Sequence, residues 1–558
     1  ELAFGTKSLW DMKQVEIYRG AQSYAQGRNA IAGAVVMTSN DPTQEWEGAA
    51  KLNMGNHRLA QTAALISGPV VKDELAFRLS VDHQQRETAV DLPHYDPVGN
   101  PRWFKATNTR AKLLWTPSAL PDLYSRLTFN HLNARAPQSE TELQPNSPRY
   151  TPERPVFQTR SASTIWDIGY QLSEHWKWEN KLVYTHFIHD RKTTSPFNTA
   201  LPPNRRGVPA RVDGNEFQIE PIVKYENEKY RGLFGLFYFN AKQDERVTML
   251  NGRIARTPIT TNFNDKTKTK AAFGEITFTP DIPFELTLSA RYEQEHHQRK
   301  GKSAMFSINR DKKYNVFLPK ADIAWKMNDD QRLGFKVGKG YNPGGAGVTF
   351  GVPYTSYEYD AEYVWNYEFY HRWTSADKRL RINSNLFYND YKDMQLPFTL
   401  GPNSIVIRNA DKVVTYGAEI NTEWQATEKL ALNAGIGMLK TDIKRYPNSG
   451  IEGNKLARAP SFSGKVGANY RLLDHLEIGT NYSYNSSYYS TADNLANGKV
   501  GHYDQLDVYL AYDFKHARIT LYADNVLNSR KDILLVPRSG DITRQPERQI
   551  GLSTELRF

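Results

Sequence analysis

Cysteine is absent from the 558 residues of this chain. Its absence excludes disulfide scaffolds, cysteine nucleophiles and metal sites built from thiolates. Long hydrophobic runs are also missing. The longest, such as Ala30–Met37, fall far short of the roughly 20 apolar residues that a membrane-spanning helix needs. The sequence is therefore not that of a helical membrane protein.

Motifs of catalysis and nucleotide binding are missing as well. G-x-S-x-G, H-E-x-x-H, a P-loop and G-x-G-x-x-G occur in no context that would support them. The net charge is +10, but the basic residues are scattered over polar segments rather than gathered on one face of a nucleic-acid-binding module. We therefore expect no enzymatic activity, no cofactor, no resident metal and no nucleic-acid partner.

The chain does contain many aromatic residues, 12% of the total, and apolar residues are spread along its whole length. This composition argues against disorder, although the mean hydropathy is only −0.65. The first residues, Glu1-Leu-Ala-Phe, form neither a signal peptide nor a plausible initiation site. We expect a processed or truncated piece of a longer mature protein.

Apolar and polar side chains alternate with a period of two, which predicts strands with one apolar and one polar face. In the segment 476–485, one face carries Leu476, Ile478, Thr480, Tyr482 and Tyr484, and the other carries Glu477, Gly479, Asn481, Ser483 and Asn485. The same alternation occurs at residues 75–82, 506–514 and 549–558. The period alone does not show which face would point into a barrel.

Connections between the predicted strands alternate in length. Short turns are expected at 117–121, 328–330, 374–378 and 473–475, and long polar loops near 83–107, 132–162, 190–215, 241–269, 296–313, 341–359, 392–409, 443–456, 486–502 and 529–546. This asymmetry and an even count of about 22 strands are typical of a bacterial outer-membrane barrel. We predict an all-β fold, an antiparallel transmembrane β-barrel with aromatic residues such as Tyr512 and Phe514 at its strand ends.

Residues 1–44 do not follow the barrel pattern. They are rich in small residues, and Gly20, Gly27 and Gly33 mark tight turns between short strands. The predicted domains are therefore a compact module at 1–44 and a barrel at 45–558.

The module resembles the end of the plug domain of TonB-dependent outer-membrane receptors. The matching residues are Val15, Glu16, Arg19, Gly20, Gln22, Ser23, Gly27, Arg28, Asn29, Ala30, Gly33 and Thr38, while Ala21 replaces the usual proline. Barrel motifs of the family are matched at 340–345, 363–368, 386–393, 416–419, 453–460 and 521–528, and the chain ends in Phe558 like other outer-membrane proteins.

The resemblance implies active import of a ferric siderophore across the outer membrane. It implies energy supplied through TonB, ExbB and ExbD, contact with outer-membrane lipid and lipopolysaccharide, and a monomer. Only the C-terminal part of the family's plug is matched, so we expect the natural protein to extend further toward its N-terminus and to carry a TonB box there.

The resemblance also implies a latch between plug and barrel. Arg19 matches the plug arginine, and Glu368 and Glu419 match glutamates of the barrel wall. A buried cation needs a partner, so these three residues are predicted to hold the plug. The alternative is that Arg19 is solvated and that the glutamates line water.

Two basic segments suggest how an anionic chelate would be attracted. They contain Arg191, Lys192, Arg205, Arg206 and Arg211 in one, and Arg299, Lys300, Lys302, Arg310, Lys312 and Lys313 in the other. Aromatic residues at 341–359 suit a flat, partly apolar ligand. The predicted ligand contacts are Tyr341, Tyr354, Arg205, Arg206 and Arg299, with lipopolysaccharide phosphates or plain solvation as the alternative for the basic segments.

Histidines offer weaker signals. His296 and His297 could bind a metal, but no third ligand is placed by spacing, so solvated histidines are favoured. A role as haem ligands is likewise not favoured for His94 and His131, because the haem boxes of the family are missing. Import of haem, cobalamin or a saccharide stays open, as does a passive porin-like channel, against which the module at 1–44 argues.

Overall fold

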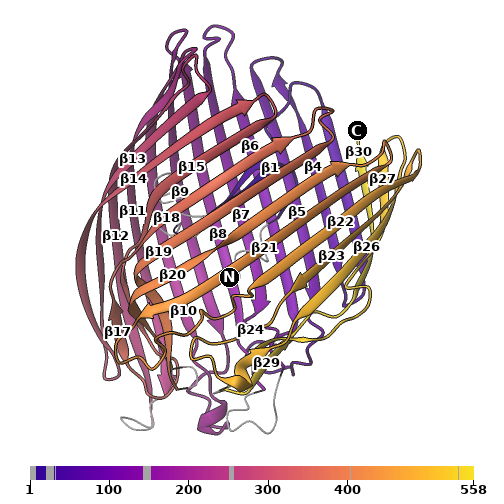
Figure 1. Cartoon of the computed structure of the whole chain (residues 1–558). Helices are drawn as coiled ribbons and strands as arrows, with labels where there is room; N and C mark the ends of the chain where they lie inside the picture. The colour runs from indigo at the N-terminus through magenta and orange to yellow at the C-terminus, as the bar shows by residue number, and fades with distance from the viewer. Residues whose placement is uncertain are drawn as a thin grey trace.

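The computed structural model describes residues 8–19, 31, 33–142, 152–250, 257–401, 404–537 and 539–558, and only the backbone of Arg19 and Asn204. Within these ranges, 22 antiparallel strands form one closed barrel, which confirms the predicted all-β antiparallel barrel. Figure 1 shows the strands running obliquely around the barrel. The barrel closes where the last strand, β30, pairs with the first barrel strand, β3.

The barrel strands are β3 (Glu47–Gly55), β4 (Ala60–Val71), β5 (Leu75–Glu87), β6 (Trp103–Trp115), β7 (Leu123–Pro137), β8 (Val156–Gln171), β9 (Trp176–Lys192), β10 (Ala210–Glu226), β11 (Tyr230–Leu250), β12 (Pro258–Phe278), β13 (Phe284–Lys302), β14 (Ser307–Asn328), β15 (Gln331–Asn342), β18 (Glu362–Thr374), β19 (Leu380–Gly401), β20 (Ser404–Gln425), β21 (Leu430–Arg445), β22 (Phe462–Leu473), β23 (Leu476–Asn485), β26 (Tyr503–Asp513), β27 (Ala517–Asp524) and β30 (Gln549–Arg557). Separate two-stranded sheets pair β1 (Met12–Arg19) with β2 (Gly33–Ser39), β16 (Gly345–Val348) with β17 (Ser356–Tyr359), β24 (Tyr488–Tyr489) with β25 (Lys499–Val500), and β28 (Asp532–Val536) with β29 (Asp541–Arg544). Two short 3-10 helices are η1 (Pro203–Arg205) and η2 (Ala496–Gly498).

The apolar face of the strands points outward. On β5, Leu79 and Val81 are 47% and 43% exposed, whereas their neighbours Arg78 and Asp82 are 4% and 2% exposed. An exposed apolar wall around a polar interior is the arrangement of a barrel whose outer surface meets hydrocarbon, the reverse of a soluble barrel. The structure therefore decides the orientation that the period of two leaves open.

Aromatic side chains gather on this outer surface beside the short turns. Trp115, Trp176 and Phe284 are exposed at the strand ends there, and the Phe284 ring lies 6.3 Å from that of Trp325. Tyr512 and Phe514 belong to the same group, with ring centroids 4.7 Å apart. Such rings suit the boundary between hydrocarbon and water, so the expected aromatic strand ends are found.

Short turns and long connections lie at opposite ends of the barrel, as predicted, but three expected loops are wrong. Strands occupy most of 241–269, 296–313 and 392–409, since β11, β13 and β19 extend to Leu250, Lys302 and Gly401. The outward positions of these extensions are polar, as at the exposed Asn262 and Lys266 of β12. A strand that continues past the apolar band keeps polar residues on both faces, and the sequence pattern of such a strand resembles a loop.

The long connections fold back over the barrel end and form small apolar cores. One core joins Val247, Phe263 and Ile308 of the strands to Val348 of β16. Another joins Leu396 and Val413 to Ile451 of the 446–461 connection. These contacts hold the connections against the strands at this end of the barrel.

The β1–β2 hairpin and the segments beside it lie inside the barrel (Figure 1). Trp10 packs against Ala49, Ala63 and Leu65 of the inner wall, and its indole N–H donates to the Ala64 carbonyl at 3.2 Å. The first barrel strand begins at Glu47. A division into a plug part at 1–44 and a barrel at 45–558 stays a prediction. No helix in the described part of the chain has the length and hydrophobicity that crossing a bilayer would need.

Candidate plug anchor and ligand site

The predicted latch is only partly visible. Arg19 pairs with Gly33 through its backbone, but its side chain and the plug motif at residues 20–30 lie outside the described residues. Glu368 faces the lumen from β18 and receives Lys336 Nζ at 3.2 Å, and Glu419 faces the lumen from β20. Both glutamates are thus placed where a plug cation could reach them, and the latch stays a prediction.

A second set of contacts joins the hairpin to the barrel wall with the charges reversed. Here the carboxylates lie beside the hairpin and the cations lie on the barrel. Asp11, just before β1, accepts hydrogen bonds from Arg78 of β5, from Nε at 2.7 Å and from Nη2 at 2.5 Å. Both side chains are almost fully buried. Arg78 also contacts Glu47 at the start of β3. Because a buried charge is stable only when it is paired and hydrogen-bonded, this bidentate pair holds the start of the hairpin in place.

Asp41 makes the matching contact after the hairpin. Its carboxylate accepts from Arg126 of β7 at 2.8 Å through both Nε and Nη2, and from Lys112 Nζ of β6 at 3.2 Å. Burial alone would raise the pKa of Asp41, but the hydrogen bonds and charges of Arg126 and Lys112 prevail and lower it. Asp41 is therefore a carboxylate at neutral pH, and we call the contacts of Asp11 and Asp41 with Arg78, Lys112 and Arg126 the hairpin anchor.

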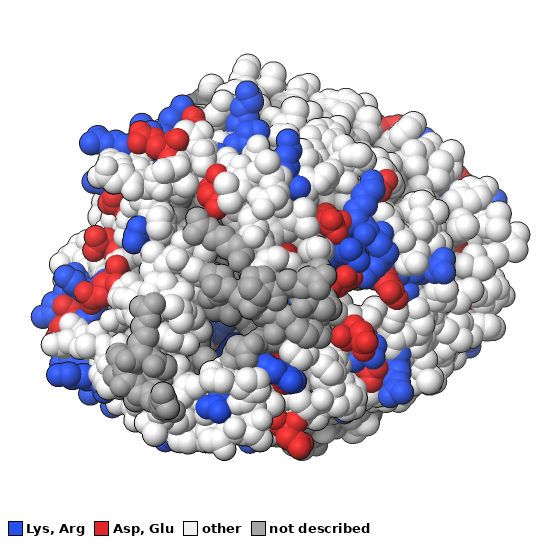
Figure 2. Space-filling model, turned by 90° about the horizontal axis from the view of Figure 1, so that it is seen from below, with Lys and Arg blue, Asp and Glu red and all other residues white. Residues whose placement is uncertain are grey.

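The loop cations predicted to meet a ligand are largely paired with carboxylates. Arg205 contacts Glu153, and Arg299 contacts Asp265 and lies 2.8 Å from Glu245. Arg206 differs, because its Nε donates to the Leu201 carbonyl at 2.8 Å. Figure 2 agrees with this pairing, since basic and acidic side chains are intermixed on the end that carries the long connections.

The two tyrosines predicted to meet a ligand have different environments. Tyr341 is fully buried, and its hydroxyl donates to Glu293 of β13. Tyr354 lies between β16 and β17, is half-buried, and packs against the apolar core around Val348. Burial raises its pKa. Tyr354 is therefore the more accessible of the two, and neither assignment is tested by the structure.

The histidines have carboxylate neighbours or open surroundings. His296 lies 2.6 Å from Asp311 and His297 lies 3.3 Å from Asp265, while His94 and His131 are exposed. Across the described ranges, no group of three or more potential ligands is placed to hold a metal ion.

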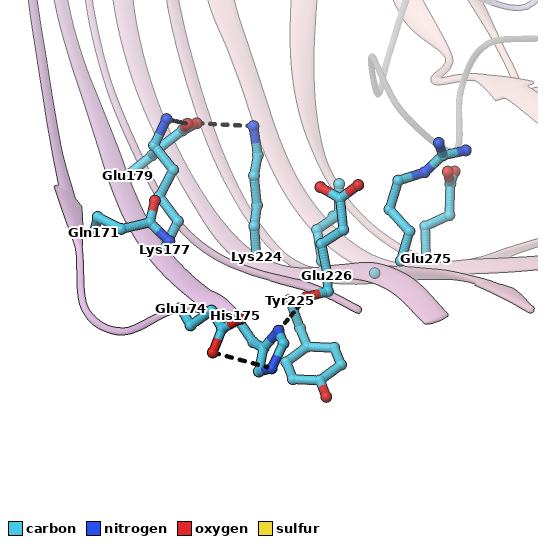
Figure 3. A pocket seen from close by; sticks show the side chains of 12 residues that line it. Gln171, Glu174, His175, Lys177, Glu179, Lys224, Tyr225, Glu226 and Glu275 are labelled. Atoms are coloured by element: carbon cyan, nitrogen blue, oxygen red, sulfur yellow. Dashed lines mark hydrogen bonds and ion pairs between the residues drawn. The ribbon is translucent and has the colours of Figure 1, made fainter. Parts of the chain in front are cut away.

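Near the short turns, a cavity of about 460 Å³ opens on the inner wall between β8 and β12. Figure 3 shows Lys177 and Lys224 reaching Glu179 from two strands, at 3.2 and 3.0 Å. His175 donates from Nδ1 to the Glu226 carbonyl at 2.8 Å. These contacts connect neighbouring strands at the rim of the barrel.

Comparison with known proteins decides the family. The model described as "TonB dependent receptor-like, beta-barrel" matches residues 76–528. The chain belongs to this family. The pesticin receptor of Yersinia pestis is 22% identical over 306 residues, which cover 52% of this chain and 44% of that receptor. The probable TonB-dependent receptor BfrD of Bordetella pertussis is 25% identical over 166 residues, 28% of this chain and 22% of BfrD. The matches thus span less than half of these curated relatives.

Solved structures of the family share the fold. The ferric yersiniabactin uptake receptor FyuA from Yersinia pestis superposes with a TM-score of 0.82 at 17% identity, over 98% of this chain and 85% of FyuA. The siderophore receptor PiuA from Acinetobacter baumannii gives 0.79 at 14% identity, over 98% and 86%. The copper transporter OprC gives 0.77 at 13% identity, over 98% and 85%. Each of these proteins is a receptor or transporter, and at these identities the likeness concerns the fold alone.

Within this family of receptors, the hairpin anchor is the feature that sequence reasoning missed. Asp11 and Asp41 are single acidic residues in no recognisable motif. The sequence feature that could have predicted the anchor lies in the barrel. Arg78, Lys112 and Arg126 occupy inward positions close to the short-turn ends of three successive strands. A row of inward cations at one level of a barrel needs anionic partners, and the segments beside the hairpin supply them.

Proposed function

We propose that this chain is part of a TonB-dependent receptor that imports a ferric siderophore across the bacterial outer membrane. The observation that carries the proposal is a hairpin anchored inside a 22-stranded barrel. The family assignment and the siderophore receptors among the structural relatives support it. An occupied lumen argues against a passive channel.

The importer binds its ligand at the end with the long connections. We assign Tyr354 and Arg206 to the ligand surface first, since one is partly accessible and the other has no carboxylate within ion-pair distance among the described side chains. Arg205 and Arg299 would act after exchanging a carboxylate of the protein for one of the ligand. Tyr341 would act only after leaving Glu293.

Energy input is part of the proposal because a tight site does not release its ligand unaided. A ligand shifts a two-state plug only by its difference in affinity for the two states. TonB, with ExbB and ExbD, would supply the work that favours the releasing state. The receptor would act as a monomer in contact with lipid and lipopolysaccharide.

Iron uptake tests this function directly. Cells that lack their own siderophore receptors would express the full-length protein, and uptake of radioactive iron would be measured for a panel of ferric siderophores with and without functional TonB. We expect uptake of one chelate class that disappears without TonB. Equal uptake with and without TonB would indicate a passive channel, and no uptake of any ferric chelate would overturn the siderophore assignment.

A further inference from the structure

The basic residues of segment 299–313 are divided between the two faces of the barrel wall. Arg299 and Arg310 are only 7% and 2% exposed and lie on the inward face of β13 and β14. Successive side chains of a strand point to opposite faces, and these two strands pair without a register shift. The exposed outward positions are therefore those of Lys300, Lys302 and Lys313. A ligand inside the lumen would not meet these three lysines.

β12 carries the same outward charge in a regular row. Its pairing with β11 and with β13 has no bulge. Thr267 and Thr269 are 8% and 2% exposed and face inward, whereas the lysines that alternate with them are exposed. From the long connections toward the short turn, the outward residues are Lys266, Lys268, Lys270, Ala272, Gly274 and Ile276. Three cations thus follow directly on the apolar part of the same strand.

Neighbouring strands widen this row into a patch. Lys266 lies opposite Lys242 of β11, and Lys268 lies opposite His296 of β13, which in turn lies opposite Lys313 of β14. Figure 1 shows these four strands side by side. We define the basic face as the outward cations Lys242, Arg246, Lys266, Lys268, Lys270, Lys300, Lys302 and Lys313. The outward positions of the same four strands, as far as they are described, hold two carboxylates, Asp244 and Asp311. The face therefore has a large excess of positive charge.

The protein does little to neutralise the basic face. Within the described ranges, none of its eight cations lies within ion-pair distance of a carboxylate. Asp311 is already engaged by His296 at 2.6 Å and by Gln298 Nε2 at 2.9 Å. The inward Arg299 differs, since it lies 2.8 Å from Glu245. Like charges gathered on one surface repel one another and attract anions from outside the protein.

The height of the basic face matches the far edge of a membrane. Phe278, at the short-turn end of β12, is eight residues from Lys270, which is about 27 Å along a strand. At a tilt of about 40° this is about 21 Å along the membrane normal, and the apolar band of such barrels is about 25 Å tall. Tyr292 and Phe317, which are 47% and 55% exposed, form an aromatic row one outward position below Lys270. The ammonium groups thus begin where the hydrocarbon ends.

We propose that the basic face binds the phosphate groups of lipopolysaccharide in the outer leaflet. The apolar surface beneath it contacts the acyl chains, so a single lipid meets both surfaces. The long connections, which are extracellular in barrels of this type, place the face on that leaflet. The assignment rests on the outer-membrane location in the proposed function and specifies which side of the barrel holds its lipid partner. It does not depend on the imported ligand.

Lipid A with both phosphates and lipid A stripped of both test the requirement for charge. Each would be titrated onto full-length, delipidated protein in a non-ionic detergent, and bound lipid would be counted by native mass spectrometry. We expect the bisphosphorylated form to bind at least about tenfold more tightly. EDTA should not abolish this binding, because the lysines themselves supply the cations. Millimolar inorganic phosphate should displace little lipid, since it has no acyl chains to hold it beside the apolar surface.

Neutralising the row on β12 should remove the preference for phosphate. Combining Lys266→Gln, Lys268→Gln and Lys270→Gln should weaken binding of bisphosphorylated lipid A by at least about 30-fold, since one ammonium beside an anionic lipid surface contributes about fivefold. Arginine at the same three positions should keep the binding. The matched control replaces with glutamine three exposed lysines of the short turns, at the opposite end of the barrel: Lys72, Lys429 and Lys515.

Equal binding of the two lipid A forms would overturn the proposal, as would unchanged affinity in the triple variant or an equal loss in the control. Loss of binding in EDTA would show a bridging metal ion, and displacement by inorganic phosphate would show a general anion site, and either result rejects the assignment. If the triple variant fails to fold, Lys268→Gln alone should weaken binding about fivefold. Lipid A binding by a protein that takes up no ferric chelate would reject the import function and keep the basic face.

Discussion

Arg126 donates two hydrogen bonds of 2.8 Å to Asp41, one to each carboxylate oxygen. The two residues are 85 positions apart in the chain. They join the segment that follows the hairpin to β7, the last of the three successive strands that carry an anchoring cation. Arg78 and Asp11 make the corresponding contact on the other side of the hairpin. The hairpin is thus held at both ends by bidentate pairs between an aspartate carboxylate and an arginine guanidinium.

Removing Asp11 should release one end of the hairpin. Asp11→Ala leaves the buried Arg78 with Glu47 and the Asp41 carbonyl as its remaining partners, and the loss of one partner of a buried pair costs about 3–5 kcal/mol. We expect amide hydrogen exchange in β1 and β2 to become at least about 100-fold faster. Glu423→Ala is the control, since its pair with Arg381 is exposed on both sides. Unchanged exchange in Asp11→Ala would mean that the pair does not hold the hairpin.

Acid should weaken the other end of the hairpin only at low pH. The folded protein lowers the pKa of Asp41 below its usual value of 3.8, so the stabilisation is complete above that value and is lost as the pH falls through the folded pKa. After correction for intrinsic rates, amide hydrogen exchange in β2 should therefore stay constant from about pH 8 to about pH 5. Opening that begins near neutral pH, or an identical profile in Asp41→Asn, would contradict this assignment.

The level of the membrane can be located on one strand. Ile276 and Asn262 both project outward from β12, and Ile276 is 46% exposed. Ile276→Arg should destabilise the folded barrel in lipid by about 1–2 kcal/mol, because a cation there meets the edge of the hydrocarbon, two residues from the end of β12. Asn262→Arg, beyond the apolar band, should change the unfolding free energy little. Urea unfolding in vesicles measures both, and equal effects would place the band elsewhere.

The packing of the 88–102 connection can be followed through Tyr95. Its hydroxyl donates to the Arg154 carbonyl, and burial raises its pKa to about 12, against the opposing influence of Arg191 and Arg135. The difference in absorbance at 295 nm between the native protein and Tyr95→Phe should therefore appear only near pH 12. A difference already complete at about pH 10 would show an exposed phenol. Tyr95→Phe should also make this connection more sensitive to trypsin.

Much of the fold follows from the sequence, because a period of two is a local property. The segment predicted at 476–485 is β23, with the same bounds. The direction of the apolar face is not local, and it is set by closure of the whole barrel. The loop expected at 241–269 is wrong because β11 and β12 extend through it. A strand that has water on both faces, as around Asn262, loses its alternation of apolar and polar residues.

The site was harder to predict because its contacts join distant segments. Arg299 looks like a free loop cation in the sequence, yet Asp265 and Glu245 meet it from 34 and 54 positions away. The family motif drew attention to a plug arginine, Arg19, whereas the contacts in the described residues run from hairpin aspartates to barrel arginines. Only pairing across the barrel wall shows which charges are already satisfied.

Ligand binding by the full-length protein is the most direct test of ferric siderophore recognition. Tryptophan fluorescence in detergent would be titrated with catecholate, hydroxamate and carboxylate ferric siderophores, with their iron-free forms, and with haem, cobalamin and copper(II). We expect submicromolar quenching by one ferric chelate and none by its iron-free form. No quenching by any ferric chelate, together with quenching by haem, cobalamin or copper(II), would contradict the siderophore assignment.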